Sequence, residues 1–133
     1  MSSARPLSPT ALVTGANRGI GLEVSRQLAQ AGMRVLLGAR DRAKGEAAAQ
    51  ALAGEGLGVE AVVLDVTDPA GVEALGSRLT AVDVLVNNAG IDYDTDQTAL
   101  SSDLNRVRTI FETNVFGAWM IAQAVGPGMR SRG

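Results

Sequence analysis

The chain has 133 residues, a net charge of -2, 46% hydrophobic and 20% charged residues, which suits one globular domain with one core. Cysteine and histidine are absent, which excludes disulfides, Cys- or His-ligated metals and a Ser-His-Asp triad. There is no basic footprint for nucleic acid or an anionic membrane, no secretory signal and no apolar run of ~18 residues for a membrane span. We therefore expect a cytoplasmic protein.

Short apolar runs alternate with longer amphipathic stretches along the chain. In chain order, strands are expected at 10–14, 33–39 and 59–66, with a fourth strand and its exit over 82–90. Helices are expected at 19–31, 41–53 and 68–79, and apolar positions from 104 to 125 mark a long final helix. Asp68-Pro69 is expected to open the third helix as N-cap and first helical residue. The strands are nearly continuous apolar runs, which is typical of a parallel sheet buried on both faces. Four βα units in succession therefore predict an α/β fold with helices on either side of the sheet.

A glycine-rich turn, TGANRGIG (14–21), joins the first strand to the first helix. Gly15 can adopt backbone angles that a Cβ forbids, Gly19 lets a ligand approach the main chain, and Gly21 lets the helix pack closely on the sheet. The helix N-terminus then offers its amides to a pyrophosphate. Three glycines also fit a plain strand-to-helix turn, and the GxxxGxG spacing differs from the general GxGxxG fingerprint. The position in the first βα unit favours nucleotide binding.

Four motifs, in this order and spacing, resemble those of the short-chain dehydrogenases/reductases. TGANRGIG is similar to the family's TGxxxGxG coenzyme turn, Asp65-Val66 to the pair that meets the adenine, DVLVNNAG (83–90) to its NNAG segment, and TNVFG (113–117) to the segment with its catalytic-site asparagine. A finer resemblance, through GARDRAKGEAAAQAL and DVTDPAGVEAL, is to carbonyl-reductase-like members. The family resemblance implies a Rossmann-type dinucleotide-binding domain over 1–133. It also implies hydride transfer between a nicotinamide coenzyme and a small carbonyl or alcohol substrate. The coenzyme residues that it implies are Gly15, Asn17, Arg18, Gly19, Ile20, Gly21, Arg40, Asp65, Val66, Asn88, Ala89 and Gly90.

The choice between NADP and NAD depends on the end of the second strand. By resemblance, Ala39 occupies the position of the acid that binds the ribose hydroxyls of NAD, and Arg40 the position of the base in NADP-using members. Arg18 and Arg40 could grip a 2′-phosphate through charge-assisted bonds, although either could be a solvated cation. Asp41 is the competing signal for NAD, since it lies about twenty residues past the glycines. Asp41 is also well placed as a helix N-cap, so we predict NADP.

Two other groups of candidate residues have a structural reading beside the functional one. Asp65 could accept from the adenine amino group while the amide of Val66 binds a ring nitrogen, or Asp65 could cap the next turn. In the NNAG segment we expect Asn87 to be the more structural asparagine and Asn88 to Gly90 to lie nearer the coenzyme. All of these positions follow strand ends, where open α/β sheets bind ligands.

The resemblance implies a catalytic tetrad of asparagine, serine, tyrosine and lysine, and Asn114 matches the asparagine. The family's tyrosine and lysine lie four residues apart and after the asparagine. Here Tyr93 and Lys44 are the single tyrosine and lysine, and both precede Asn114. We therefore expect the chain to be the N-terminal half of a reductase, truncated before a fifth strand and inactive alone.

Two further features bear on possible partners and on metal binding. The final helix is apolar nearly all round from Val115 to Val125, which predicts burial on both sides, by missing strands or through a possible homo-oligomer. An acidic run with Asp92, Asp94 and Asp96, followed by Asp103, imitates a calcium loop. It lacks the required glycine and the final glutamate, so we expect a solvated loop and no metal.

Three functions remain open at this point. The first is an NADP-dependent reductase; the second is a non-catalytic NADP-binding sensor or regulatory module; the third is a ketoreductase acting on carrier-linked 3-oxoacyl groups. The substrate, the reaction direction and the stereochemistry are not predicted.

Overall fold

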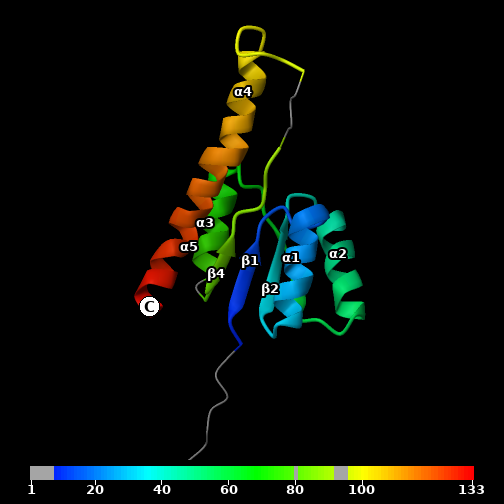
Figure 1. Cartoon of the computed structure of the whole chain (residues 1–133). Coiled ribbons are helices and arrows are strands. Elements are labelled where there is room, and N and C mark those ends of the chain that lie inside the picture. Colours follow the sequence, from blue (N-terminus) through cyan, green and yellow to red (C-terminus); the bar gives the residue numbers. More distant parts are fainter. Residues whose placement is uncertain (1–7, 80, 92–95) are drawn as a thin grey trace, which may run out of the picture.

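The computed structural model describes residues 8–79, 81–91 and 96–133, and Figure 1 shows helices on both faces of a central sheet. The predicted βα alternation is confirmed, with β1 (Thr10–Val13), α1 (Gly19–Gln30), β2 (Arg34–Ala39), α2 (Arg42–Gly54), β3 (Val59–Val63), α3 (Pro69–Arg78) and β4 (Val84–Val86). The remaining helical stretch consists of α4 (Leu104–Phe111), a π-helical segment η1 (Glu112–Gly117) and α5 (Ala118–Arg132).

The strands form one parallel sheet in the spatial order β3-β2-β1-β4. Leu12 of β1 pairs with Leu36 of β2 on one side and with Leu85 of β4 on the other. The chain therefore builds outward from β1 to β3 and then crosses back to place β4 on the opposite side of β1. This reversal opens a crevice at the carboxyl ends of β1 and β4, which is where open α/β sheets bind ligands.

The two faces of the sheet are covered by different helices. Leu12 and Leu36 pack in a core cluster with residues of α3 and α5. Their sequence neighbours Val13 and Leu37 pack with residues of α1 and α2 on the other face. Because successive side chains of a strand point to opposite faces, both faces need apolar residues, and the strands read as continuous apolar runs.

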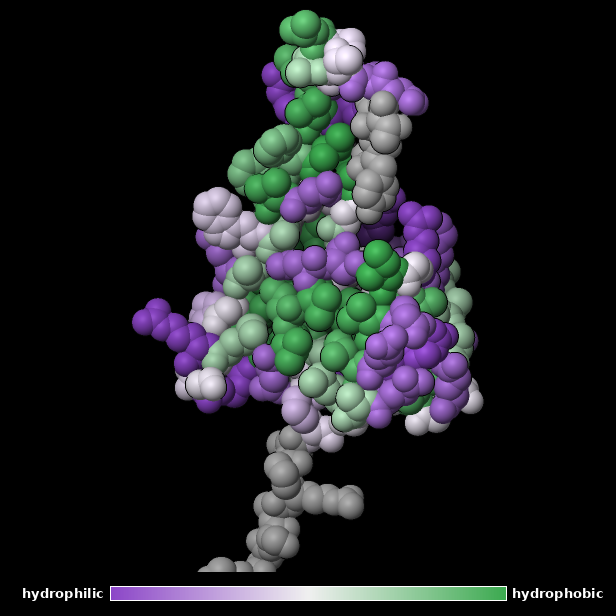
Figure 2. Space-filling model, in the orientation of Figure 1, coloured by the Kyte–Doolittle hydropathy of each residue, from purple (hydrophilic) through white to green (hydrophobic). Residues whose placement is uncertain are grey.

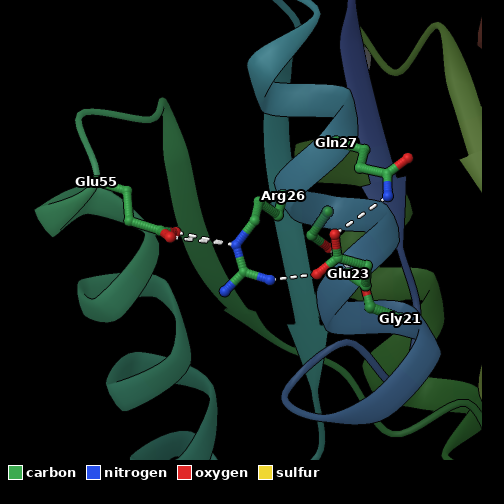
Figure 3. A network of polar contacts seen from close by, with 6 residues as sticks. Gly21, Glu23, Arg26, Gln27 and Glu55 are labelled. Carbon is green, nitrogen blue, oxygen red and sulfur yellow. Dashed lines mark hydrogen bonds and ion pairs between the residues drawn. The ribbon is translucent and has the colours of Figure 1, made fainter.

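Surface charges add a link between α1 and α2 (Figure 3). Arg26 of α1 donates from Nε to Glu55, just past α2, at 3.1 Å and 3.3 Å, and also pairs with Glu23 one turn earlier. Gln27 donates to the same Glu23 carboxylate at 3.1 Å. Both acids are about half exposed, so solvent screens these pairs and they add little stability.

Some element boundaries differ from the prediction. The predicted strand 59–66 ends earlier, at Val63, and in the predicted fourth strand with its exit the strand itself ends at Val86, because the residues after both strands turn away to line the crevice. Asp68 and Pro69 begin α3 as predicted, but the Asp68 side chain makes no capping hydrogen bond. The final helix continues past the predicted apolar positions, through Pro127 to Arg132. Pro127 lacks the N–H that would bond one turn back, which weakens that turn without ending the helix.

In the helical stretch from α4 to α5, buried residues occur only from the end of η1 onward, and α4 has none. Ile121 and Val125 are 1% and 4% exposed in the core beside α3, whereas five large apolar residues are 43–61% exposed, namely Leu104, Phe111, Val115, Phe116 and Trp119. Figure 2 shows apolar side chains gathered along this stretch. The predicted burial on both sides requires further strands or a partner subunit, and it stays a prediction. None of the helices that the structure describes is both long and apolar enough to cross a membrane.

Candidate functional site

An open cleft of about 400 Å³ lies at the crevice between the ends of β1 and β4. Its volume is within the range of about 300–1,000 Å³ for small-molecule sites. Five segments line it: the glycine turn, the end of β2, the residues after β3, the residues after β4 and one residue of η1. The lining residues are Gly15, Asn17, Arg18, Gly19, Ile20, Arg40, Leu64, Asp65, Val66, Thr67, Asn88, Ala89, Gly90, Ile91 and Thr113.

The three glycines of the turn have different roles. Gly15 has φ +59°, and a Cβ there would lie 2.8 Å from Cα of Ala89. Gly19 has the same φ, but a Cβ there would meet nothing within 4 Å, so the main chain at Gly19 is open to the cleft. Gly21 does not line the cleft, and a Cβ there would lie 2.4 Å from Nδ2 of Asn88 and 2.7 Å from the Gly15 carbonyl oxygen. Gly21 therefore allows close packing behind the turn.

Hydrogen bonds between β1 and β4 hold the turn in place. The backbone N–H groups of Asn88 and Ala89 donate to the buried Thr14 hydroxyl at 3.0 Å and 2.9 Å. In return, Nδ2 of Asn88 donates to the carbonyls of Thr14 and Gly15 at 3.2 Å and 3.1 Å. Asn88 is thus structural as well as part of the cleft lining, while Asn87 donates to the Ala118 carbonyl at 3.2 Å and fastens β4 to α5.

The N-terminus of α1 points at the cleft without a capping side chain. Arg18 is at the N-cap position and makes no side-chain cap bond, and the first turn holds no acid. In α2, by contrast, Asp41 caps the helix by accepting from the Lys44 N–H at 3.0 Å. The first amides of α1 and the positive end of its dipole are therefore available to an anion such as a phosphate.

Two arginines supply positive charge to the same cleft. Arg18 and Arg40 are both exposed and line it, and neither forms an ion pair with another described residue. Ala39 is 2% exposed beneath α2. Asp41 lines a separate, much smaller cavity of about 20 Å³. Asp41, the acid whose position favoured NAD, therefore caps α2 and does not line the cleft.

Asp65 follows β3 and has its carboxylate held by the next turn. Its Oδ1 accepts from the Thr67 hydroxyl at 2.6 Å and from the Thr67 N–H at 2.9 Å. These bonds, with a smaller contribution from the positive charge of Arg40, lower the pKa of Asp65 below its ordinary value. Asp65 is thus a turn-capping residue and a negatively charged lining residue at once.

Asn114 lies in η1 and does not line the cleft directly. Its Oδ1 accepts from the Ile91 N–H at 2.8 Å and its Nδ2 donates to the Ile91 carbonyl at 3.0 Å. Both backbone groups of Ile91 are satisfied by one side chain, so Asn114 fixes the chain as it leaves β4. π-helical segments are rare and occur often at functional sites, and this one also places Thr113 in the lining.

The model of the short chain dehydrogenase family matches residues 9–133. The chain belongs to the short-chain dehydrogenase family. It is 39% identical over 130 residues to the 1-deoxy-11-beta-hydroxypentalenate dehydrogenase of Streptomyces avermitilis, covering 93% of this chain and 47% of that relative. It is 37% identical over 139 residues to the NADPH carbonyl reductase 1 of Mus musculus, covering 100% of this chain and 48% of the relative.

A solved short-chain dehydrogenase structure shares the fold. The gluconate 5-dehydrogenase of Burkholderia cenocepacia J2315, in complex with NADP and tartrate, matches with a TM-score of 0.86 and 33% identity, over 93% of this chain and 49% of that one. The chain thus spans about half the length of the curated relatives it matches. Family membership is confirmed, and carbonyl reductases are among the relatives, as predicted.

The structure places all the predicted coenzyme residues of this short-chain dehydrogenase in the cleft lining except Gly21. Sequence reasoning missed four lining residues: Leu64, Thr67, Ile91 and Thr113. Thr67 had a signal, because it directly follows the Asp65-Val66 pair, and so did Thr113, a polar neighbour of Asn114 in an apolar helix. Lys44 lies in α2. Tyr93 and most of the acidic run, including Asp92 and Asp94, lie outside the described residues, so the expected solvated loop stays a prediction.

Proposed function

We propose that this chain forms the coenzyme-binding part of an NADP-dependent oxidoreductase that acts on a small carbonyl or alcohol substrate. The observation that carries the proposal is the pair Arg18 and Arg40, which line the same cleft as the glycine turn and the uncapped start of α1. An NADP molecule carries both a pyrophosphate and a 2′-phosphate, and this cleft offers amides for one and guanidinium groups for the other.

The residues present suit each part of such a coenzyme. The Gly19 backbone and the first amides of α1 would hold the pyrophosphate, Arg18 and Arg40 the 2′-phosphate, and Asp65 with Val66 the adenine. Asn88, Ala89 and Gly90 would line the ribose side. Bound NADPH supplies a hydride to a carbonyl carbon. Asn114 holds the backbone of Ile91, which is itself a lining residue. Asn114 would thereby help to shape the cleft that a substrate would enter.

Coenzyme binding is testable on the purified chain. Titration calorimetry with NADPH and NADH should show tighter binding of NADPH. Arg40→Ala should weaken NADPH binding about 10-fold or more, since a charge-assisted bond is worth about 1.5–3 kcal/mol, and should leave NADH binding nearly unchanged. Equal affinity of the wild-type chain for both coenzymes, or no binding of either, would contradict the proposal.

Arg34→Ala is the matched control. Arg34 begins β2 and Arg40 follows its end, so the two arginines lie about 20 Å apart along one strand. Arg34 is exposed and paired with Glu60 at 2.8 Å, and its removal changes the net charge of the chain as Arg40→Ala does. NADPH affinity in Arg34→Ala should match the wild type, and a loss equal to that of Arg40→Ala would indicate a general charge effect instead.

Catalysis by the 133 residues alone is expected to be absent. Hydride transfer to a carbonyl needs a proton donor, and by family resemblance that donor is a tyrosine assisted by a lysine four residues later, a pair that this sequence lacks. Turnover of a panel of aldehydes and ketones, followed by NADPH absorbance, should stay at the level of a blank. Any turnover that disappears in Asn114→Ala would show that this chain carries a working site by itself. The cytoplasmic location, the homo-oligomer and the substrate class stay predictions.

A further inference from the structure

The Asp65–Thr67 turn has a geometry that goes beyond capping. The turn is closed by the Asp68 N–H, which donates to the Asp65 carbonyl at 3.1 Å. Both hydrogen bonds to the Asp65 side chain come from Thr67, and both end on Oδ1. Oδ2 accepts no hydrogen bond from the described residues, although Asp65 and Thr67 both line the cleft. The turn thus holds one oxygen and leaves the other available to a ligand.

We propose that Thr67 is a positioning residue that orients the Asp65 carboxylate for the adenine amino group, and so sets which base the cleft accepts. The proposal rests on the proposed coenzyme function. A carboxylate accepts hydrogen bonds and does not donate them. An oriented Oδ2 therefore favours adenine, whose exocyclic amino group donates, over hypoxanthine, whose carbonyl oxygen at the same position only accepts.

The substitution Thr67→Val removes the Thr67 hydroxyl and leaves the backbone N–H in place. With Thr67 present, two donors converge on Oδ1 and restrict the side-chain torsions of Asp65. With valine, only the backbone N–H bond remains, and the carboxylate can rotate about it. The same hydroxyl is the largest cause of the lowered pKa of Asp65, which agrees with a close bond from Thr67 to the ionised carboxylate.

Base selectivity gives a measurement that a purely structural role would not change. The probes are NADP and its deaminated analogue with hypoxanthine in place of adenine, titrated by calorimetry at pH 7 and fixed salt. The wild-type chain should bind NADP about tenfold more tightly than the analogue, because opposed acceptors leave both oxygens unpaired. Thr67→Val should reduce that ratio to about two- or threefold, and Thr67→Ser, which keeps a hydroxyl, should retain it.

Three further variants complete the design. Thr67→Ala serves if Thr67→Val unfolds, as judged by circular dichroism, since it removes the same hydroxyl without a second methyl. Thr109→Val is the matched control, because the Thr109 hydroxyl makes one bond to the Asn105 carbonyl at 3.0 Å on exposed α4, and its ratio should equal the wild-type ratio. Asp65→Asn should lower the ratio, since an amide can donate to the analogue.

The outcomes separate this inference from the function on which it rests. A reduced ratio in Thr67→Val or Thr67→Ala, with an unchanged ratio in Thr67→Ser and Thr109→Val, supports positioning by Thr67. An unchanged ratio in Thr67→Val and Thr67→Ala, or equal weakening of both nucleotides in them, overturns the inference and leaves NADP binding standing. A wild-type chain that binds neither nucleotide overturns the proposed function and the inference with it.

Discussion

Gly21→Ala tests whether the glycine turn depends on the packing between α1 and the β4 segment. The new Cβ would lie 2.4 Å from Nδ2 of Asn88, 2.7 Å from the Gly15 carbonyl oxygen and 3.0 Å from Cα of Ala16. Two of these three atoms belong to the backbone and cannot rotate away. The Asn88 amide must therefore move, and it donates to the carbonyls of Thr14 and Gly15 from its present position.

The expected cost follows from these contacts. Two hydrogen bonds are worth about 0.5–1.5 kcal/mol each, and forcing a methyl against fixed backbone costs about 1–3 kcal/mol. Alanine recovers about 1 kcal/mol through its better helix propensity. We expect the free energy of unfolding to fall by about 2–4 kcal/mol, a large part of the stability of a small domain.

Urea unfolding followed by circular dichroism measures this free energy. Gly54→Ala is the matched control, because Gly54 is also helical, at the end of α2, and a Cβ there would meet nothing within 4 Å. That variant should be unchanged or slightly more stable. If Gly21→Ala were as stable as Gly54→Ala, the close approach of Asn88 to the turn would not exist in solution and the reasoning would be refuted.

Two further predictions concern the strand ends beside the cleft. Thr14→Val removes the hydroxyl that accepts from the N–H groups of Asn88 and Ala89. The Asn88 N–H keeps its second bond, to the Val86 carbonyl at 3.0 Å, but the Ala89 N–H loses its partner. Because Thr14 is 1% exposed, urea unfolding should show a loss of about 1–3 kcal/mol. The pKa of Asp65 is lowered by folding, so its contribution to stability is present above the unfolded pKa of about 3.9 and is lost as pH falls through the lower folded value. Asp65→Asn should therefore show a shallower fall of melting temperature on acidification than the wild type, and an equally steep fall in both would contradict this assignment.

The local elements could be predicted from the sequence because each has a nearby cause. Strand and helix order follows from apolar runs and periodicity, and TGANRGIG marks the turn because glycine permits the φ of +59° that Gly15 and Gly19 adopt. Asp41 could be assigned to the start of α2 because capping needs only the next three residues. Most of the cleft lining was predicted from the family resemblance of the motifs that follow the strands, and parallel strands bring these carboxyl ends to one edge.

Long-range contacts decided the rest. The double role of Asn88 depends on carbonyls 73 and 74 residues earlier in the chain, and no local pattern encodes that pairing. The π-helical segment and the hold of Asn114 on Ile91 arise only once β4 and the last helix pack together. Which side of the α4 to α5 stretch packs on the sheet was likewise decided by the fold, because a sequence reports that a side chain is apolar, whereas its burial depends on which surfaces the fold brings against it. By itself, the sequence determined the α/β order and the glycine turn through local backbone and side-chain preferences. Tertiary packing alone decided which of these residues hold the cleft in shape and which remain open to a ligand.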